Sequence, residues 1–184
     1  MGPNWDLGTA IAIAAVPHLK DPRQVPYLWQ KVLMACPSVT GPKHKPGTPL
    51  TKEEQAAEED CQQQCAALTK VCLAALPGVK RQQASLVVNG FVEVPSGLLH
   101  QKLGKRFASH AQAMSLAALA QAGKMKLDCA SSGRFLKLHV EGLRKCGAPA
   151  KMVDEYVAAA REAYAEDRQV MQMLTKLQAK PAAP

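Results

Sequence analysis

The chain contains the segment Gln112-Ala-Met-Ser-Leu-Ala-Ala-Leu-Ala-Gln-Ala-Gly-Lys124, which follows a similar segment, Gln83-Ala-Ser-Leu-Val-Val-Asn-Gly-Phe-Val-Glu-Val-Pro95. The two start 29 residues apart, and each precedes a second amphipathic segment, residues 97–107 and residues 132–144. Irregular repeats of this size are typical of diverged helical hairpins. The sequence therefore predicts an all-α fold of stacked antiparallel helical hairpins, similar to an α-solenoid.

The N-terminal part, residues 1–36, follows the same plan. A short apolar helix over Leu7–Val16 should break at Pro17, and a second helix is expected over Gln24–Ala35. We therefore predict an N-terminal helical hairpin. Residues 37–50 contain four prolines and two glycines, which predicts an exposed loop or linker.

Residues 51–180 form the predicted helical-repeat region. At its start, Thr51 and Glu54 match a capping box, in which each side chain bonds the backbone amide of the other residue. A helix is therefore expected from Thr51 to about Leu76, where Pro77-Gly78 should end it.

Helices are also predicted for the rest of this region. Ser109 and Gln112 suggest a second capping box at the start of an Ala-rich helix. Residues 150–179 are expected to form one long, uninterrupted C-terminal helix, followed by a disordered tail over residues 181–184. No convincing run of alternating strand residues occurs, and residues 84–94, which are rich in β-branched side chains, are the one segment for which a strand is an alternative to a helix.

The composition indicates a folded chain with a core of small and aliphatic residues. Of the 184 residues, 47% are apolar and only 4% are aromatic. The longest apolar stretches have about ten residues, whereas a membrane-spanning helix needs about eighteen or more. No membrane span is therefore predicted.

Positive charge concentrates between Val79 and Lys151. This segment has twelve basic and three acidic side chains, which gives +9 in 73 residues, compared with +8 for the whole chain. A polyanion is the natural partner of such a surface, and the phosphate backbone of nucleic acid is the commonest one. The alternative is that the charges only solvate helix faces. The candidate nucleic-acid-binding residues are Lys80, Arg81, Lys102, Lys105, Arg106, Lys124, Lys126, Arg134, Lys137, Arg144 and Lys145.

These cationic side chains are expected to share one edge of the fold. Lys102, Lys105 and Arg106 lie at a predicted helix end, and Lys124 and Lys126 follow in the turn after the next helix. In stacked hairpins such positions would recur along one edge and form a continuous basic stripe. Few aromatic residues are available to stack on bases, so contacts to the backbone of duplex or folded RNA are predicted.

The chain has six cysteines, of which Cys61, Cys65 and Cys72 share one face of a predicted helix. Three thiols on one stripe could ligate a metal ion or pair with a neighbouring helix. Since no fourth ligand follows at a matching spacing, buried core cysteines are the favoured interpretation. We predict no metal site and no cofactor.

The sequence gives little support for catalysis. The five histidines are scattered, and no metalloprotease, phosphate-loop or nucleophile-elbow motif occurs. His100 and His110 lie among basic residues and could contact phosphate, although ordinary surface histidines explain them as well. The chain is therefore predicted not to be an enzyme.

Residues 107–125 read Phe-Ala-Ser-His-Ala-Gln-Ala-Met-Ser-Leu-Ala-Ala-Leu-Ala-Gln-Ala-Gly-Lys-Met. This segment resembles the repeat unit of organellar helical-repeat RNA-binding proteins, namely the octotricopeptide, heptatricopeptide and FAST-kinase-like families. Their apolar helix has the form Leu-x-Ala-Leu-Ala-x-x-Gly, which residues 116–123 match, while residues 6–16 and 84–92 fit more loosely. The resemblance implies an α-solenoid in mitochondria or plastids that contacts RNA, in some cases within a ribosome. It assigns no base-reading residue.

The function expected from the sequence is non-catalytic RNA binding, as an accessory subunit of an organellar ribosome or ribonucleoprotein. The expected partners are RNA, with ribosomal RNA first, and neighbouring protein subunits. Mitochondria are the expected compartment, with plastids and the cytoplasm as alternatives. A second hypothesis is a protein–protein scaffold or supernumerary subunit of a large respiratory or photosynthetic assembly, with the acidic helix Thr51–Leu76 among its docking surfaces.

Overall fold

The computed structural model describes residues 3–37, 48–127 and 133–179, and these residues form helices without any strand. The all-α prediction is therefore confirmed for this part of the chain. The helices are α1 (Pro3–Ala15), the short 3-10 helix η1 (Val16–His18), α2 (Gln24–Met34), α3 (Lys52–Ala74), α4 (Arg81–Leu99), α5 (Ala108–Met125), α6 (Gly133–Lys145), α7 (Ala150–Ala163) and α8 (Arg168–Ala179). Most of the predicted loop (residues 38–47) and the predicted tail (residues 181–184) lie outside the described residues.

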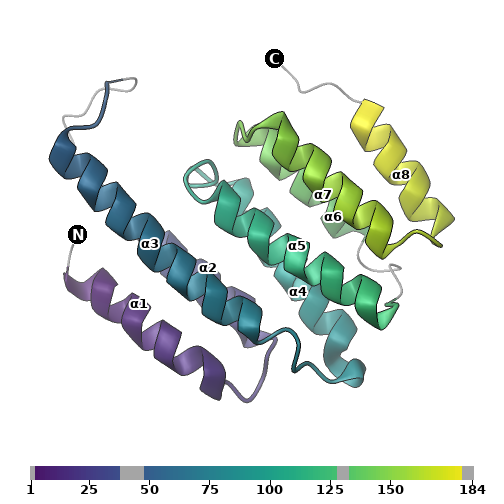
Figure 1. The fold of residues 1–184 in the computed structure, drawn as a ribbon, viewed down its shortest axis with the longest axis horizontal. Helices are drawn as coiled ribbons and strands as arrows, with labels where there is room; N and C mark the ends of the chain where they lie inside the picture. Colours follow the sequence, from purple (N-terminus) through teal and green to yellow (C-terminus); the bar gives the residue numbers. More distant parts are fainter. Residues whose placement is uncertain (1–2, 38–47, 128–132, 180–184) are drawn as a thin grey trace.

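The helices pack as a bundle of two layers (Figure 1). Helices α1, α3, α5 and α7 lie side by side in chain order, and α2, α4 and α6 lie behind them. Helix α4 runs antiparallel to α5, as α6 does to α7, and α8 contacts both α6 and α7 at the C-terminal end. Each helix of the main body therefore contacts both layers.

The core runs through the whole bundle and combines two tryptophans with many small residues. Trp29 is fully buried, and its Nε1 donates a hydrogen bond to Thr69 Oγ1 at 2.9 Å. Trp5 Nε1 donates to the Val32 carbonyl at 3.0 Å, which joins α1 to α2. Since each buried indole N–H has a partner, neither ring leaves an unsatisfied polar group in the core.

The start of α3 confirms the predicted capping box. The Thr51 N–H donates to Glu54 Oε2 at 2.9 Å, and the Glu54 N–H donates to Thr51 Oγ1 at 3.2 Å. At α5 the second predicted capping box is wrong. That helix begins after Phe107 without a side-chain cap, and Gln112 is buried and donates to the Met152 carbonyl of α7 at 2.9 Å. Gln112 therefore serves tertiary packing instead of capping.

Helix α4 decides one alternative and corrects one prediction. Residues 84–94, the one segment for which a strand was an alternative to a helix, are helical. Helix α4 continues through Pro95 to Leu99, so residues 97–107 do not form a separate helix. A proline removes one helical hydrogen bond. Here the buried residues of α4, including Phe91 and Leu98, pack against neighbouring helices and outweigh that cost. The two predicted repeat units therefore do not have the same structure.

The predicted long C-terminal helix is also wrong, because residues 150–179 form two helices. The chain leaves α7 after Ala163, and Asp167 caps the start of α8. Its Oδ1 accepts hydrogen bonds from the backbone N–H groups of Gln169, at 3.0 Å, and Val170, at 3.1 Å. The break lets α8 fold back against α6 and α7 and bury Leu174.

Candidate nucleic-acid interface

The candidate basic residues lie at two opposite edges of the bundle, because helix α5 separates them. The turn before α5 carries Lys102, Lys105 and Arg106, and the end of α5 carries Lys124 and Lys126. Helix α5 has 18 residues and is therefore about 27 Å long. The prediction that these two groups share one edge is wrong: in an antiparallel hairpin, successive turns fall at opposite ends (Figure 1).

We call the first group the α4–α5 edge. The end of α4 and the turn after it lie beside the second half of α6. His100 Nε2 is 3.1 Å from the Leu138 carbonyl oxygen, and a Cβ added at Gly142 would lie 3.2 Å from the His100 ring. Lys105 lies close to Cys146: burial raises the pKa of that thiol, and the charge of Lys105 partly opposes the increase. Two alternate inter-helix turns, the α4–α5 turn and the α6–α7 turn, therefore lie side by side. The basic residues of the α4–α5 edge are Lys102, Lys105, Arg106, Arg144, Lys145 and Lys151.

Four of these six residues are well exposed lysines. Lys102, Lys105 and Lys145 are exposed, and within the described ranges no ion pair engages them. Lys151, at the start of α7, forms a solvent-exposed pair with Glu155 at 3.7 Å, a type of contact that water and salt largely screen. These ammonium groups are free to contact an anion.

The two arginines of this edge have structural roles. Arg144 Nη2 donates to the Leu177 carbonyl of α8 at 2.6 Å. Arg106 is only 15% exposed at its side chain and pairs with Glu58 of α3, with 2.7 Å between Nη2 and Oε2 and 3.1 Å between Nε and Oε1. It also donates to the Pro37 carbonyl at 2.9 Å. Neither guanidinium is therefore presented to a ligand.

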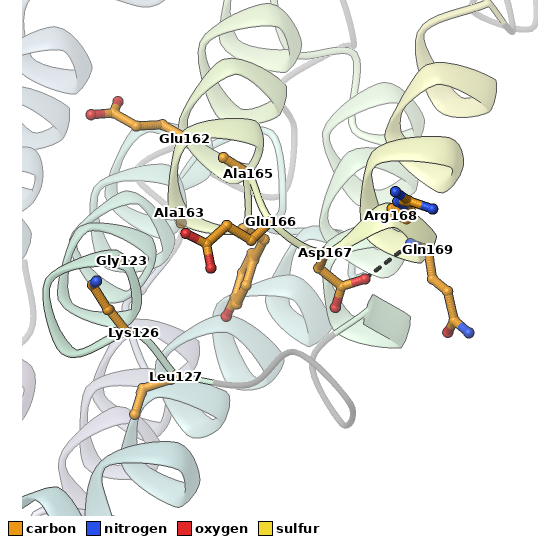
Figure 2. Close-up of a pocket in the computed structure, with 11 residues that line it drawn as sticks. Gly123, Lys126, Leu127, Glu162, Ala163, Ala165, Glu166, Asp167, Arg168 and Gln169 are labelled. Atoms are coloured by element: carbon orange, nitrogen blue, oxygen red, sulfur yellow. Dashed lines mark hydrogen bonds between the residues drawn. The ribbon is translucent and has the colours of Figure 1, made fainter.

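The opposite, α5–α6 edge is electrostatically mixed. Its basic residues are Lys80, Arg81, Lys124, Lys126 and Arg134, all of them exposed. Beside them lies a groove of about 810 Å³ between the end of α5 and the turn that joins α7 to α8 (Figure 2). Lys126 and Arg168 line this groove together with Glu162, Glu166 and Asp167. The carboxylates oppose the attraction of a polyanion to this edge. Lys137 lies on α6 and pairs with Glu141 at 3.7 Å.

Neither histidine considered for phosphate binding points to a free surface. His110 Nε2 lies 2.8 Å from Gln62 Oε1, and burial lowers the pKa of His110. His100 is held against α6 by the contact to Leu138. Both imidazoles therefore join helices together.

The predicted cysteine stripe is buried in the core. Cys61, Cys65 and Cys72 have no exposed surface, and burial raises the pKa of Cys72 to about 12. No group of side chains suited to a metal ion occurs in the ranges that the structure describes, and Cys129 lies outside them. The sequence pattern did not reveal that Cys36, which is 25 residues away in the chain, lies 2.6 Å from Cys61 between their Sγ atoms.

Two general findings bear on function. Along the described segments, no helix combines the length and the apolar character that a membrane crossing requires. Comparison of this chain with protein-family models, with curated proteins and with solved structures gives no match.

Proposed function

We propose that this chain binds RNA without catalysis and contacts the RNA backbone through Lys102, Lys105, Lys145 and Lys151. The observation that carries the proposal is that these four exposed lysines lie at the α4–α5 and α6–α7 ends of the helices, on the same edge of the bundle. Flexible ammonium groups suit phosphate oxygens, which they contact as point charges without reading sequence. The partner is a folded RNA, with ribosomal RNA first, in an organellar, mitochondrial ribosome or ribonucleoprotein.

The helix arrangement supports a role of this kind. Alternate helices pack against each other in chain order, which is the neighbour pattern of an α-solenoid. We therefore also propose that the helices form an α-solenoid, in which stacked turns present side chains at regular intervals along an edge. Among the aromatic side chains that the structure describes, Tyr27 is the most exposed, and it lies on α2, away from the α4–α5 edge. Base stacking is thus not expected to contribute at this edge.

The first test is the salt dependence of binding. Each phosphate contact adds about 0.7 to 0.9 to the slope with which the logarithm of the binding constant falls against the logarithm of the salt concentration. Four contacts therefore predict that affinity for a structured RNA falls roughly 50- to 150-fold between 50 and 200 mM monovalent salt. Filter binding or fluorescence anisotropy measures this directly. Absence of binding at 50 mM salt, or affinity that does not change with salt, would contradict the proposal.

A matched pair of variants then locates the interface. The triple variant Lys102→Gln, Lys105→Gln and Lys145→Gln should lower the salt slope by about 2 to 3, since three phosphate contacts are lost. All three side chains are exposed, so the fold should be unaffected.

The control removes the same charge from the opposite edge, with Lys80→Gln, Arg81→Gln and Lys124→Gln. These residues are also exposed. Their loss should leave the slope nearly unchanged. Equal loss of affinity in both triple variants would mean that only net charge matters, and the α4–α5 edge would not be the binding site.

One observation favours the second candidate function, a protein–protein scaffold in a large assembly. Leu7 is 61% exposed and Ile11 is 58% exposed on α1, and Ala10 and Ala14 beside them are also exposed. These residues follow helical spacing and form an apolar stripe, which a helix of another subunit could cover.

A further inference from the structure

Three thiols meet where the end of α2 approaches α3. Cys36 follows the last turn of α2, and Cys61 and Cys65 lie one helical turn apart on α3. The Sγ atoms of Cys36 and Cys61 are 2.6 Å apart, and all three cysteines are free thiols. Since a disulfide bond is about 2.05 Å long, a shift of about half an ångström would bring this pair to bonding distance.

The charges around this pair distinguish its two members. Hydrogen bonds from Cys65 and Cys61, together with the nearby Arg106, lower the pKa of Cys36 to about 6. Burial and the hydrogen bond to Cys36 raise the pKa of Cys61 to about 12. Cys36 therefore ionises more readily than Cys61, which is the arrangement of an attacking cysteine beside its resolving partner.

Arg106 anchors this arrangement from the turn between α4 and α5. Its Nη2 lies 3.2 Å from Cys61 Sγ, while its other hydrogen bonds hold Glu58 and the Pro37 carbonyl. Cys36 is 6% exposed, whereas Cys61 and Cys65 have no exposed surface. A small reagent would therefore reach Cys36 first.

We propose that Cys36 and Cys61 form a reversible dithiol–disulfide site whose oxidant is a hydroperoxide. The Cys36 thiolate attacks one oxygen of hydrogen peroxide, the O–O bond breaks, and hydroxide leaves and takes up a proton to form water. Cys61 Sγ then attacks the resulting sulfenic acid: the S–S bond forms, the S–O bond breaks, and a second water leaves with the Cys61 proton. Two thiols are oxidised and one peroxide is reduced, and an external dithiol reverses the reaction.

The test uses the full chain in its reduced form. Two equivalents of hydrogen peroxide at pH 7.5 should reduce the number of titratable thiols, measured after denaturation, from six to four. Peptide mapping should find Cys36 joined to Cys61, and dithiothreitol should restore all six thiols. Six intact thiols, a Cys36–Cys65 bond, or oxidation to sulfinic acid without a bond would each overturn the proposal.

Variants provide the matched control. Cys36→Ala and Cys61→Ala should each abolish the loss of two titratable thiols that hydrogen peroxide causes in the wild type. Cys72→Ala should retain it, because Cys72 is equally buried on α3 and has no thiol neighbour among the described hydrogen bonds. Loss of the bond in the folded Cys72→Ala variant would show that Cys72 takes part in the reaction and would overturn the assignment of the site to Cys36 and Cys61 alone.

The pH dependence gives a second readout. The titratable and charged groups that face Cys36 are Cys61, Cys65 and Glu58 of α3 and Arg106 of the α4–α5 turn. The rate of peroxide consumption should be half-maximal near pH 6 and constant above pH 7, because the thiolate of Cys36 is the nucleophile. A rate that still rises tenfold per pH unit between pH 7 and 8.5 would show an ordinary thiol and overturn the assignment of Cys36.

Discussion

His139 shows how a single residue can link several helices of this bundle. It is fully buried on α6, its Nδ1 lies 3.0 Å from Ser96 Oγ of α4 and 3.2 Å from Ser115 Oγ of α5, and its ring packs on Tyr156 of α7 with centroids 4.2 Å apart. Burial, with a smaller contribution from His100, lowers the pKa of His139 to about 3. The imidazole is therefore neutral in the folded protein near neutral pH.

This buried histidine should make folding stability depend on pH. The unfolded chain binds a proton at His139 below its ordinary pKa of 6.5, and the folded protein does so only near pH 3. Stability is therefore complete above pH 6.5 and is lost as the pH falls from 6.5 towards 3, by about 2 kcal/mol at pH 5. Urea unfolding at pH 7.5 and pH 5.0 measures the difference.

His139→Gln should reduce that difference by about 2 kcal/mol, while His18→Gln, at an exposed position, should leave it unchanged. His110 and Cys36 also have a lowered pKa in the folded protein, so they too make the protein less stable at pH 5.0 than at pH 7.5. Part of the difference in the free energy of unfolding therefore remains in the His139→Gln variant. An equal difference between pH 7.5 and pH 5.0 in wild type and His139→Gln would contradict the conclusion that burial lowers the pKa of His139.

At the scale of elements, small residues set how closely the helices pack. A Cβ added at Gly142 of α6 would lie 2.8 Å from Leu99 Cβ of α4 and 3.2 Å from the His100 ring. A Cβ at Gly123 of α5 would lie 3.2 Å from Ala163 Cα of α7. Close approach of α4 to α6 and of α5 to α7 therefore requires glycine at these positions.

Two glycine-to-alanine substitutions should have opposite effects. Gly142→Ala should destabilise the protein by about 1 to 3 kcal/mol, because Leu99 Cβ is fixed to the backbone and cannot move without shifting α4. Gly8→Ala, inside α1 with nothing within 4 Å, should stabilise it by about 0.5 to 1 kcal/mol through helix propensity. Chemical denaturation of both variants tests the pair. A neutral or stabilising Gly142→Ala would show that α4 and α6 pack less closely.

On the scale of the whole molecule, the two candidate functions use different surfaces. The exposed lysines of the α4–α5 edge lie at the helix ends, and the apolar stripe of α1 lies at the N-terminal end of the bundle (Figure 1). The surfaces do not overlap. Each can therefore be changed without the other.

This separation predicts the outcome of a comparison in cells. Tagged protein with Leu7→Lys and Ile11→Lys should still co-purify with ribosomal RNA, whereas the triple lysine variant of the α4–α5 edge should lose most of it, because phosphate contacts need the lysines. Quantitative RNA analysis of both preparations, normalised to protein, provides the measurement. The reverse result, with RNA lost only from the α1 variant, would favour the scaffold function.

Local chemistry allowed part of this fold to be predicted. The 3.6-residue apolar period predicted helices throughout, and the Thr51–Glu54 capping box placed the start of α3 within a residue, because these patterns act over three or four neighbours. The break at Asp167 had a local signal as well, since Asp is a preferred capping residue. The continuous apolar pattern on either side of it favoured a single helix instead.

The sequence by itself determined the all-α class, most helix positions and the excess of positive charge, since each depends on composition or on near neighbours. Only the tertiary structure decided the continuation of α4 through Pro95, the division of the lysines between opposite edges and the pairing of Arg106 with Glu58, 48 residues away. It alone brought Cys36 to Cys61. Such contacts join residues far apart in the chain, and their geometry exists only after the helices have packed.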